Sequence, residues 1–253
     1  MYCDNLTLCF IKYLESKGIK KIDEFKDQIQ YENLTAGMVK EQILNITEFH
    51  SNTLGYMEVM NKRLDNNIGK TVEQYKIYIK RLSKDLDNLS KKTPVNEFEK
   101  ILLDKGDIYL TRARKVIDTI YINNYIGLIM RSMKRSEMCI GDTSFNNLRR
   151  EDFIEIRNIE DCCYDMVEMD LVHLLGKIRR KGIELNFCEL VKEFCYLESL
   201  EKDSELFIIS LISYPYEFMK CCNRYREKSK SWTEDEYVLK LKKAMVVDGN
   251  SLI

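Results

Sequence analysis

The sequence predicts a mainly α-helical protein with one small β element. Its 253 residues include only two prolines and ten glycines, so residues that interrupt helices are scarce. Apolar residues recur every three or four positions over 71–91 and 96–121, as they do in amphipathic helices. Only the middle of the chain, around 137–159, has the composition of strands, and it predicts a small hairpin or ribbon.

The first 34 residues are expected to form a short helical segment of their own. Apolar spacing predicts helices over 6–16 and 22–29. Thr35 is a suitable N-cap for a third helix, because its hydroxyl can accept a hydrogen bond from a backbone N–H in the first turn. We therefore divide the chain into residues 1–34 and a larger domain over 35–253.

The same spacing predicts the remaining elements. The strands of the β element are expected over 137–140 and over 153–159, where apolar and charged residues alternate. Helical spacing returns in the remaining segments, which are 125–133, 169–181, 185–200, 206–226 and 233–244.

Charge and cysteine content exclude several classes of function. Forty basic and forty-one acidic residues give a net charge of -1, which favours neither nucleic acid nor an anionic membrane. No apolar run approaches the length that crosses a bilayer, and no basic segment precedes the apolar start, so we expect a cytoplasmic protein without a membrane span. Nine cysteines without a CxxC pair suggest buried thiols in a reducing compartment rather than a zinc site.

Residues 139–171 carry the pattern that points to chemistry, CIGDTSFNNLRREDFIEIRNIEDCCYDMVEMDL. Gly141 and Asp142 are followed five positions on by Asn147, and Asp170 begins a later Asp-Leu pair. This order resembles the phosphotransferases of the aminoglycoside and choline kinase type. The resemblance implies that Asp142 is the catalytic carboxylate, that Asn147 holds a metal ion, and that Asp170 fixes the loop through buried hydrogen bonds.

The same segment departs from that family at the positions that matter for catalysis. Asn158 stands where the resemblance implies the aspartate that binds magnesium, and a neutral amide gives a divalent ion much less charge than a carboxylate does. Ile140 replaces a histidine that braces the loop. Glu160, two positions along the expected strand, would face the same side as Asn158 and offers a substitute carboxylate. A metal site of Asn147, Asn158 and Glu160 would thus be vestigial or weak.

The C-terminal part of the sequence indicates a more specific resemblance within the kinase-like proteins. Residues 211–232, LISYPYEFMKCCNRYREKSKSW, are similar to the end of the spore-coat kinase-like proteins of the CotS type, and 48–56, EFHSNTLGY, to a helix end of the same family. The resemblance covers about 35–246 and implies the helical C-terminal lobe of a protein-kinase-like fold at the spore coat. The match at the end of the chain is carried by Pro215, Phe218, Lys220, Tyr225, Lys230, Ser231 and Trp232.

Members of that family begin with a β-rich lobe that covers the nucleotide. Here about 35 residues precede the first matching helix, and they contain a single glycine, Gly18, and no glycine-rich loop. Lys20 and Lys21 lie in no strand of the expected kind and are assigned to solvated surface. The resemblance therefore implies that most of the N-terminal lobe is lacking, and we expect no cofactor.

Three functions are consistent with these features. The first is a degenerate, non-catalytic spore-coat or sporulation protein that acts through protein contacts, in which Asp142 is a relic that holds its loop. The second is a phosphotransferase on a small hydroxylated substrate, in which Asn147 and Glu160 hold the Mg²⁺ of ATP and Asp142 is the base. The third is a helical adaptor whose likeness to kinases is accidental.

Aromatic and basic residues gather over 214–232, where they fit either a surface for a protein partner or a packed core. Acidic residues follow at once over 234–236, and for that reason we do not expect nucleic acid to bind there.

Overall fold

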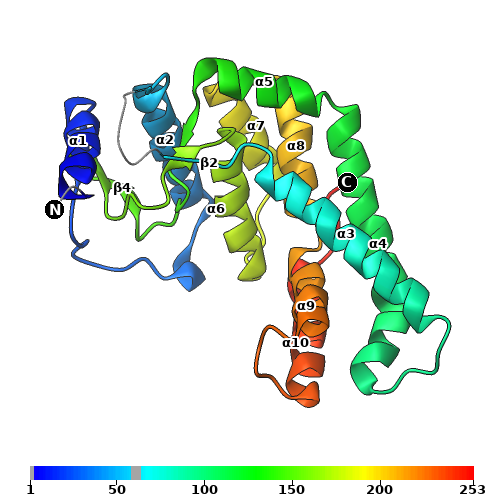
Figure 1. Ribbon diagram of the computed structural model, residues 1–253. Helices are drawn as coiled ribbons and strands as arrows, with labels where there is room; N and C mark the ends of the chain where they lie inside the picture. Colours follow the sequence, from blue (N-terminus) through cyan, green and yellow to red (C-terminus); the bar gives the residue numbers. More distant parts are fainter. Residues whose placement is uncertain (1–2, 58–63) are drawn as a thin grey trace. The chain divides into compact units, whose positions relative to one another are not determined.

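The computed structural model describes residues 3–57 and 64–253, which form ten α-helices, one 3-10 helix and six short strands (Figure 1). The expected mainly α-helical fold is confirmed. The chain divides into two compact units, one of residues 1–69 and 124–208 and one of residues 70–123 and 209–253. The boundary between residues 34 and 35 stays a prediction.

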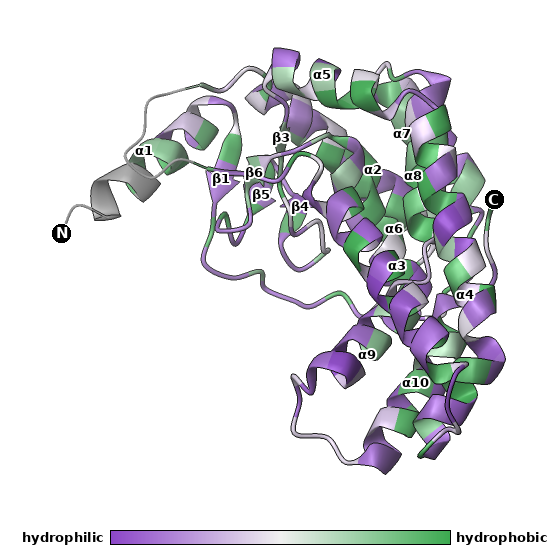
Figure 2. Cartoon of the chain, turned by 45° about the vertical axis from the view of Figure 1, so that its right-hand side comes forward, coloured by the Kyte–Doolittle hydropathy of each residue, from purple (hydrophilic) through white to green (hydrophobic). Residues whose placement is uncertain are grey.

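The first unit contains the strands and most of the helices. Its helices are α1 (Cys3–Ser16), α2 (Ala36–Thr53), α5 (Tyr125–Arg135), α6 (Glu168–Arg180), α7 (Phe187–Leu197) and most of α8 (Lys202–Ser213). Apolar side chains from these helices form its core. Figure 2 shows hydrophobic and hydrophilic residues alternating around helices such as α2 and α6. Fully buried members include Ile43, Ile46, Phe49, Leu175, Ile178 and Phe194.

The β element forms two three-stranded sheets rather than one ribbon. One sheet has the order β1 (Ile19–Lys21), β5 (Ile154–Ile156) and β4 (Leu148–Arg150), in which β4 and β5 make an antiparallel hairpin. The second has the order β2, β6 and β3, where β3 pairs with β6 and not with the hairpin. The strands of this second sheet are β2 (Asp65–Asn66), β3 (Met138–Cys139) and β6 (Cys163–Tyr164).

The helix predicted over 22–29 is wrong, because tertiary contacts hold this segment extended. After Gly18 ends α1 with a φ of 77°, strand β1 runs parallel to β5, and the Ile22 N–H donates to the Ile156 carbonyl at 3.0 Å. Further along, the Ile29 N–H donates to Asn146 Oδ1 at 3.0 Å. The Ile29 N–H, which a helix would bond to the carbonyl of residue 25, is thus used by a distant side chain.

A charged cluster stabilises the interior of the first unit. Arg131 of α5 donates to Glu137 Oε1 at 3.0 Å and to Glu168 Oε2 at 2.7 Å, and both carboxylates are fully buried. Burial opposes the charged guanidinium, but the hydrogen bonds to Glu168 and Glu137 outweigh it and raise the pKa of Arg131. Loss of this arginine would leave the buried Glu168 without its ion-pair partner and leave Glu137 only Arg135, whose Nη1 lies 3.4 Å from Glu137 Oε1.

The second unit is entirely helical in its described part. It contains α3 (Lys70–Leu89), α4 (Glu97–Ile122), α9 (Tyr216–Glu227) and α10 (Glu234–Asp248), with the end of α8. The helix expected over 206–226 is two helices, because Pro215 follows α8 and is the N-cap of α9. Gly106 does not interrupt α4; a Cβ there would lie 2.6 Å from Leu86 Cδ2, so glycine allows α3 and α4 to approach closely.

The aromatic residues of 214–232 pack mainly inside this unit. Three of them, Tyr214, Phe218 and Tyr225, stack on rings of α3 and α4 at centroid distances of 3.7, 3.9 and 3.9 Å. Trp232 lies edge-on to Tyr237 at 5.3 Å. Of the two interpretations of 214–232, a packed core and a surface for a partner, packing accounts for these aromatic rings. Among the described residues, no helix has both the length and the apolar character needed to cross a membrane.

Candidate functional site

The loop that carries Asp142 lies between β3 and β4 and begins with a glycine for steric reasons. Gly141 has a φ of 79°, which side-chain-bearing residues rarely adopt. A Cβ at this position would lie 2.3 Å from the Asp161 carbonyl oxygen. Only glycine therefore lets the loop pass the turn that contains Asp161.

Asp170 holds the start of this loop from α6. Its Oδ2 accepts the Ile140 N–H at 2.7 Å and its Oδ1 accepts the Gly141 N–H at 2.9 Å. The carboxylate is fully buried, and Ile140 is fully buried beside it. Asp170 thus fixes the loop by charge-assisted hydrogen bonds to two successive backbone amides.

His50, at the end of α2, bridges two carboxylates. Its Nε2 lies 2.9 Å from Asp170 Oδ2 and its Nδ1 lies 2.7 Å from Glu198 Oε1. Burial alone would lower the pKa of His50, but Glu198 and Asp170 outweigh it and raise that pKa to about 10. The imidazolium therefore balances two acids behind the loop.

Nothing in the sequence indicates this pairing. His50 and Glu198 are 148 positions apart, and no motif links them. Cys139 lies close enough to His50 and Asp170 for three ligand atoms to come within 4.8 Å of one another. Because both imidazole nitrogens already face carboxylate oxygens, the group is an ion-pair network without a nitrogen lone pair to offer a metal.

Asp142 and Asn147 are tied to the backbone of their own segment. Asp142 is partly exposed, and its Oδ1 accepts the Ser144 N–H at 3.1 Å. Asn147 is fully buried, and its Nδ2 donates to the carbonyls of Asp142 at 2.8 Å and Asn158 at 3.1 Å. Its Oδ1 accepts the Asn158 N–H at 2.7 Å. Both amide protons of Asn147 and one oxygen lone pair are thus in use.

Asn158 and Glu160 lie in a turn, not in a strand. The strand expected to reach Ile159 ends at Ile156, so alternation along a strand does not place these two side chains on one face. Asn158 Oδ1 accepts the Glu160 N–H at 3.0 Å, which is the hydrogen bond of an Asx turn. Glu160 is exposed.

The irregular segment over 25–30 and the start of the 3-10 helix (Tyr31–Asn33) lie against the loop. Arg149 of β4 donates to Asp27 Oδ1 at 2.7 Å, and its guanidinium carbon lies 4.5 Å from the centre of the Phe25 ring. Tyr31 meets Phe145 edge-on at 6.2 Å. From α6, His173 Nδ1 lies 3.1 Å from the Gly141 carbonyl oxygen. Residues from two other parts of the chain therefore pack against the segment over 141–149 that contains Asp142.

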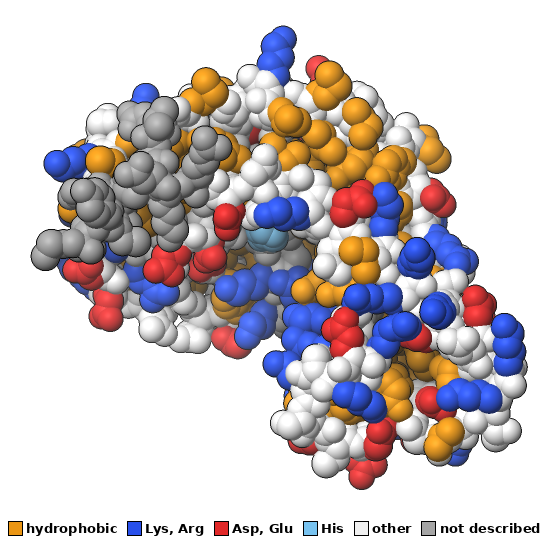
Figure 3. All heavy atoms as spheres, viewed as in Figure 1, with side chains coloured by type: hydrophobic (Ala, Val, Ile, Leu, Met, Phe, Trp, Pro, Cys, Tyr) orange, Lys and Arg blue, Asp and Glu red, His pale blue; other side chains and the backbone are white. Residues whose placement is uncertain are grey.

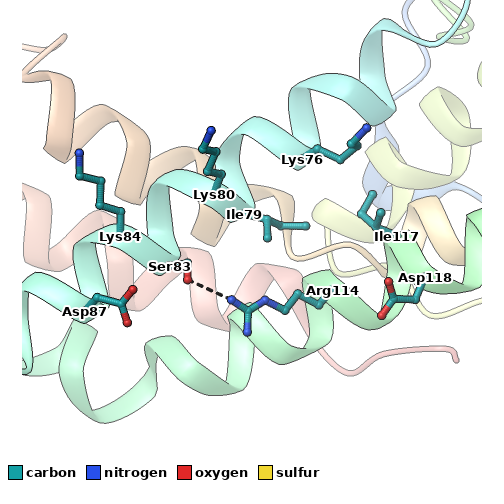
Figure 4. Close-up of a pocket in the computed structure, with 9 residues that line it drawn as sticks. All are labelled: Lys76, Ile79, Lys80, Ser83, Lys84, Asp87, Arg114, Ile117 and Asp118. Atoms are coloured by element: carbon teal, nitrogen blue, oxygen red, sulfur yellow. Dashed lines mark hydrogen bonds between the residues drawn. The ribbon is translucent and has the colours of Figure 1, made fainter.

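A separate groove lies between α3 and α4 in the second unit, with a volume of about 490 Å³ (Figure 4). Three lysines stand in a row along α3, while Arg114 reaches from α4 and donates to Ser83 Oγ at 3.0 Å. Trp232 also belongs to this unit and is not one of the residues brought together around Asp142. The groove is lined by Lys76, Lys80, Lys84 and Arg114, by Ile79 and Ile117, and by Asp87, Asp118 and Ser83.

Comparison with known proteins gives a likeness of fold. No protein-family model matches the chain, and the search of curated proteins gives no match. A solved structure described as an aminoglycoside phosphotransferase from Alicyclobacillus acidocaldarius subsp. acidocaldarius DSM 446 superposes with a TM-score of 0.72 over 97% of this chain and 79% of that one, at 12% sequence identity. The expected kinase-like fold is confirmed: the chain has the fold of an aminoglycoside phosphotransferase.

Proposed function

We propose that this chain is a degenerate, non-catalytic member of the kinase-like proteins and that it acts through protein contacts. The observation that carries the proposal is the bonding of Asn147. Its amide, expected to hold a metal ion, makes two hydrogen bonds to the backbone of Asn158 and one to the carbonyl of Asp142. These bonds hold the Asp142 loop in its conformation, so the Asn147 side chain serves the fold and not a metal ion.

The residues present do not fit a magnesium site. Mg²⁺ is bound in phosphotransferases mainly through carboxylates and phosphates, with near-octahedral geometry. Asn158 supplies a neutral amide, and its Oδ1 accepts the Glu160 N–H. Because phosphoryl transfer depends on neutralising charge with the metal, a weak or absent ion would remove most of the rate. Asp142 then stabilises its loop through Ser144.

Protein contacts are favoured by the groove between α3 and α4. Lys80 and Lys84 form no ion pair with the described residues, and with Lys76 they follow one side of α3 at four-residue spacing. The apolar side chains of Ile79 and Ile117 lie between the charged rows. An acidic, partly apolar segment of a partner protein fits this combination. The similarity of 211–232 to the CotS type makes spore-coat components the partners we propose, and the spore coat the location.

A phosphotransferase is the second candidate, because Glu160 is exposed and Asp142 is partly exposed. In that case Glu160 and Asn147 would hold Mg²⁺ with ATP, and the substrate would be a small hydroxylated molecule. Asp142 would accept the proton of the substrate hydroxyl.

Titration of the chain with ATP and MgCl₂, followed by its melting temperature, separates the two candidates. We expect no saturable shift for the natural sequence, because binding of nucleotide to the folded state would raise the melting temperature. Asn158→Asp restores the missing carboxylate and is the matched positive variant. A magnesium-dependent shift of the natural sequence that Asp142→Ala or Glu160→Ala abolishes would overturn the non-catalytic proposal.

A further inference from the structure

Helix α6 carries a row of groups that can bear positive charge beside the Asp142 loop. His173 and Lys177 of α6, and Lys181 at its C-cap, follow one another at four-residue intervals, the spacing that places side chains on one face of a helix. The row begins where His173 Nδ1 lies 3.1 Å from the Gly141 carbonyl oxygen. Lys and Arg side chains gather over the C-terminal end of α6 on the face shown in Figure 3.

Both lysines of this row approach the same tyrosine. The Lys177 Nζ lies 5.4 Å and the Lys181 Nζ 5.7 Å from the centre of the Tyr31 ring. Within the described chain neither ammonium forms an ion pair with a carboxylate. Two like charges held near one ring repel each other, and an anion placed between them would remove that repulsion.

Tyr31 adds a hydrogen-bond donor that has no partner. Its Oη is buried and makes no hydrogen bond with any described residue. Buried hydroxyls are normally satisfied, so an orphan of this kind indicates an absent ligand atom or water. Burial, and after it the charge of Asp142, raises the pKa of Tyr31 to about 12, so the hydroxyl keeps its proton at neutral pH.

We propose that Lys177, Lys181 and the Tyr31 hydroxyl form a binding site for the phosphate group of a small ligand. The two ammonium groups supply the charge that a phosphate dianion requires, and the hydroxyl donates to one of its oxygens. Asp142, whose charge acts on Tyr31, repels further negative charge and can accept a hydrogen bond from a ligand hydroxyl. The site needs neither metal nor nucleotide and goes beyond the proposed function.

Sodium phosphate is the first probe, and glycerol 3-phosphate is the second. The ¹⁵N-labelled full chain is titrated at pH 7.5 with ionic strength held constant by NaCl, and the amide signals of 29–34 and 173–181 are followed. We expect saturable shifts confined to these segments. Tighter binding of glycerol 3-phosphate would assign the site to organic phosphomonoesters, and equal or weaker binding would assign it to inorganic phosphate.

Three variants test the assignment. Lys177→Gln with Lys181→Gln should weaken phosphate binding at least about tenfold, since it removes both charges. Tyr31→Phe should weaken it by about fivefold, the effect of one hydrogen bond. Lys192→Gln, which removes one exposed lysine from α7, is the control for loss of positive charge elsewhere on the same unit and should bind phosphate as the natural sequence does.

Two results would overturn the site. One is the absence of saturable binding of either probe by the natural sequence. The other is unchanged phosphate affinity in the folded double variant with only its melting temperature lowered, because the lysines would then serve just to hold Tyr31.

Discussion

Asn147 and Asn158 exchange two hydrogen bonds, one from Asn147 Nδ2 to the Asn158 carbonyl at 3.1 Å and one from the Asn158 N–H to Asn147 Oδ1 at 2.7 Å. A third bond, from Nδ2 to the Asp142 carbonyl at 2.8 Å, ties the Asp142 loop to the same side chain. One buried amide therefore fixes the loop and the turn after β5 against each other. The Asn147 side chain therefore has a structural role in the fold.

Asn147→Ala should lower the free energy of unfolding by about 2 to 4 kcal/mol, because it deletes three hydrogen bonds and leaves buried backbone groups without partners. Asn158→Ala is the control. It removes only the bond to the Glu160 N–H and should cost less than about 1 kcal/mol. Urea denaturation followed by circular dichroism measures both, and equal costs would contradict the assignment.

Gly141→Ala should destabilise the chain by more than Gly18→Ala does, although both glycines have nearly the same φ, 79° and 77°. The strain of that conformation costs about 1 to 2 kcal/mol at either position. At Gly141 a Cβ would also meet the Asp161 carbonyl oxygen at 2.3 Å, whereas nothing lies within 4 Å at Gly18. The difference between the melting temperatures of the two variants measures the cost of the contact with the Asp161 carbonyl. Similar melting temperatures would contradict that contact.

The stability of the first unit should fall as pH rises from about 6.5 to about 10 through the titration of His50. Its pKa rises from the ordinary 6.5 to about 10 in the fold, where burial is outweighed by Glu198 and Asp170. Between these two pKa values the folded state keeps a proton that the unfolded state has lost. The stabilisation that His50 contributes is therefore complete below about pH 6.5 and is lost as the pH rises through about 10. Melting curves of the natural sequence and of His50→Gln from pH 6 to 10 measure the difference. The variant should start less stable and show the smaller decline with pH.

The stability of the second unit should also fall as pH rises, but at lower pH, through the titration of Asp248. Its Oδ1 and Oδ2 accept the N–H groups of Glu217 at 3.0 Å and Phe218 at 2.8 Å, yet burial raises its pKa from 3.8 to about 6. The protonated form is therefore favoured by folding. Its contribution is full below about pH 4 and is lost as pH rises through about 6.

Asp248→Asn should flatten this dependence between pH 4 and 7, because the amide cannot titrate and still offers one acceptor oxygen. Chemical shifts of the Glu217 and Phe218 amides, followed over the same pH range, report the Asp248 titration directly. A midpoint near 4 in the natural sequence would contradict the raised pKa.

Much of the helical architecture could be predicted, and local strand geometry could not. The periodicity of 71–91 and 96–121 led to α3 and α4 within two residues of their observed ends. Apolar spacing predicts a helix over 22–29, but the bonds of this segment to Ile156 and Asn146 keep it out of a helix. Likewise, the expected strand over 153–159 ended three residues early, because Asn158 caps a turn. Local propensity is a weak guide where a segment's backbone bonds go to distant residues.

The sequence by itself determined the helical class and the order of Gly141, Asp142, Asn147 and Asp170, because amphipathic spacing and motif order are written along the chain. Only the tertiary structure decided what these residues do. It placed His50 between Glu198 and Asp170. It bound both the oxygen and the nitrogen of the Asn147 amide to backbone groups, and it placed Tyr31 beside Lys177 and Lys181. His50 and its two carboxylates, like Tyr31 and its two lysines, are separated by more than a hundred residues and meet through packing, which no short window of sequence specifies.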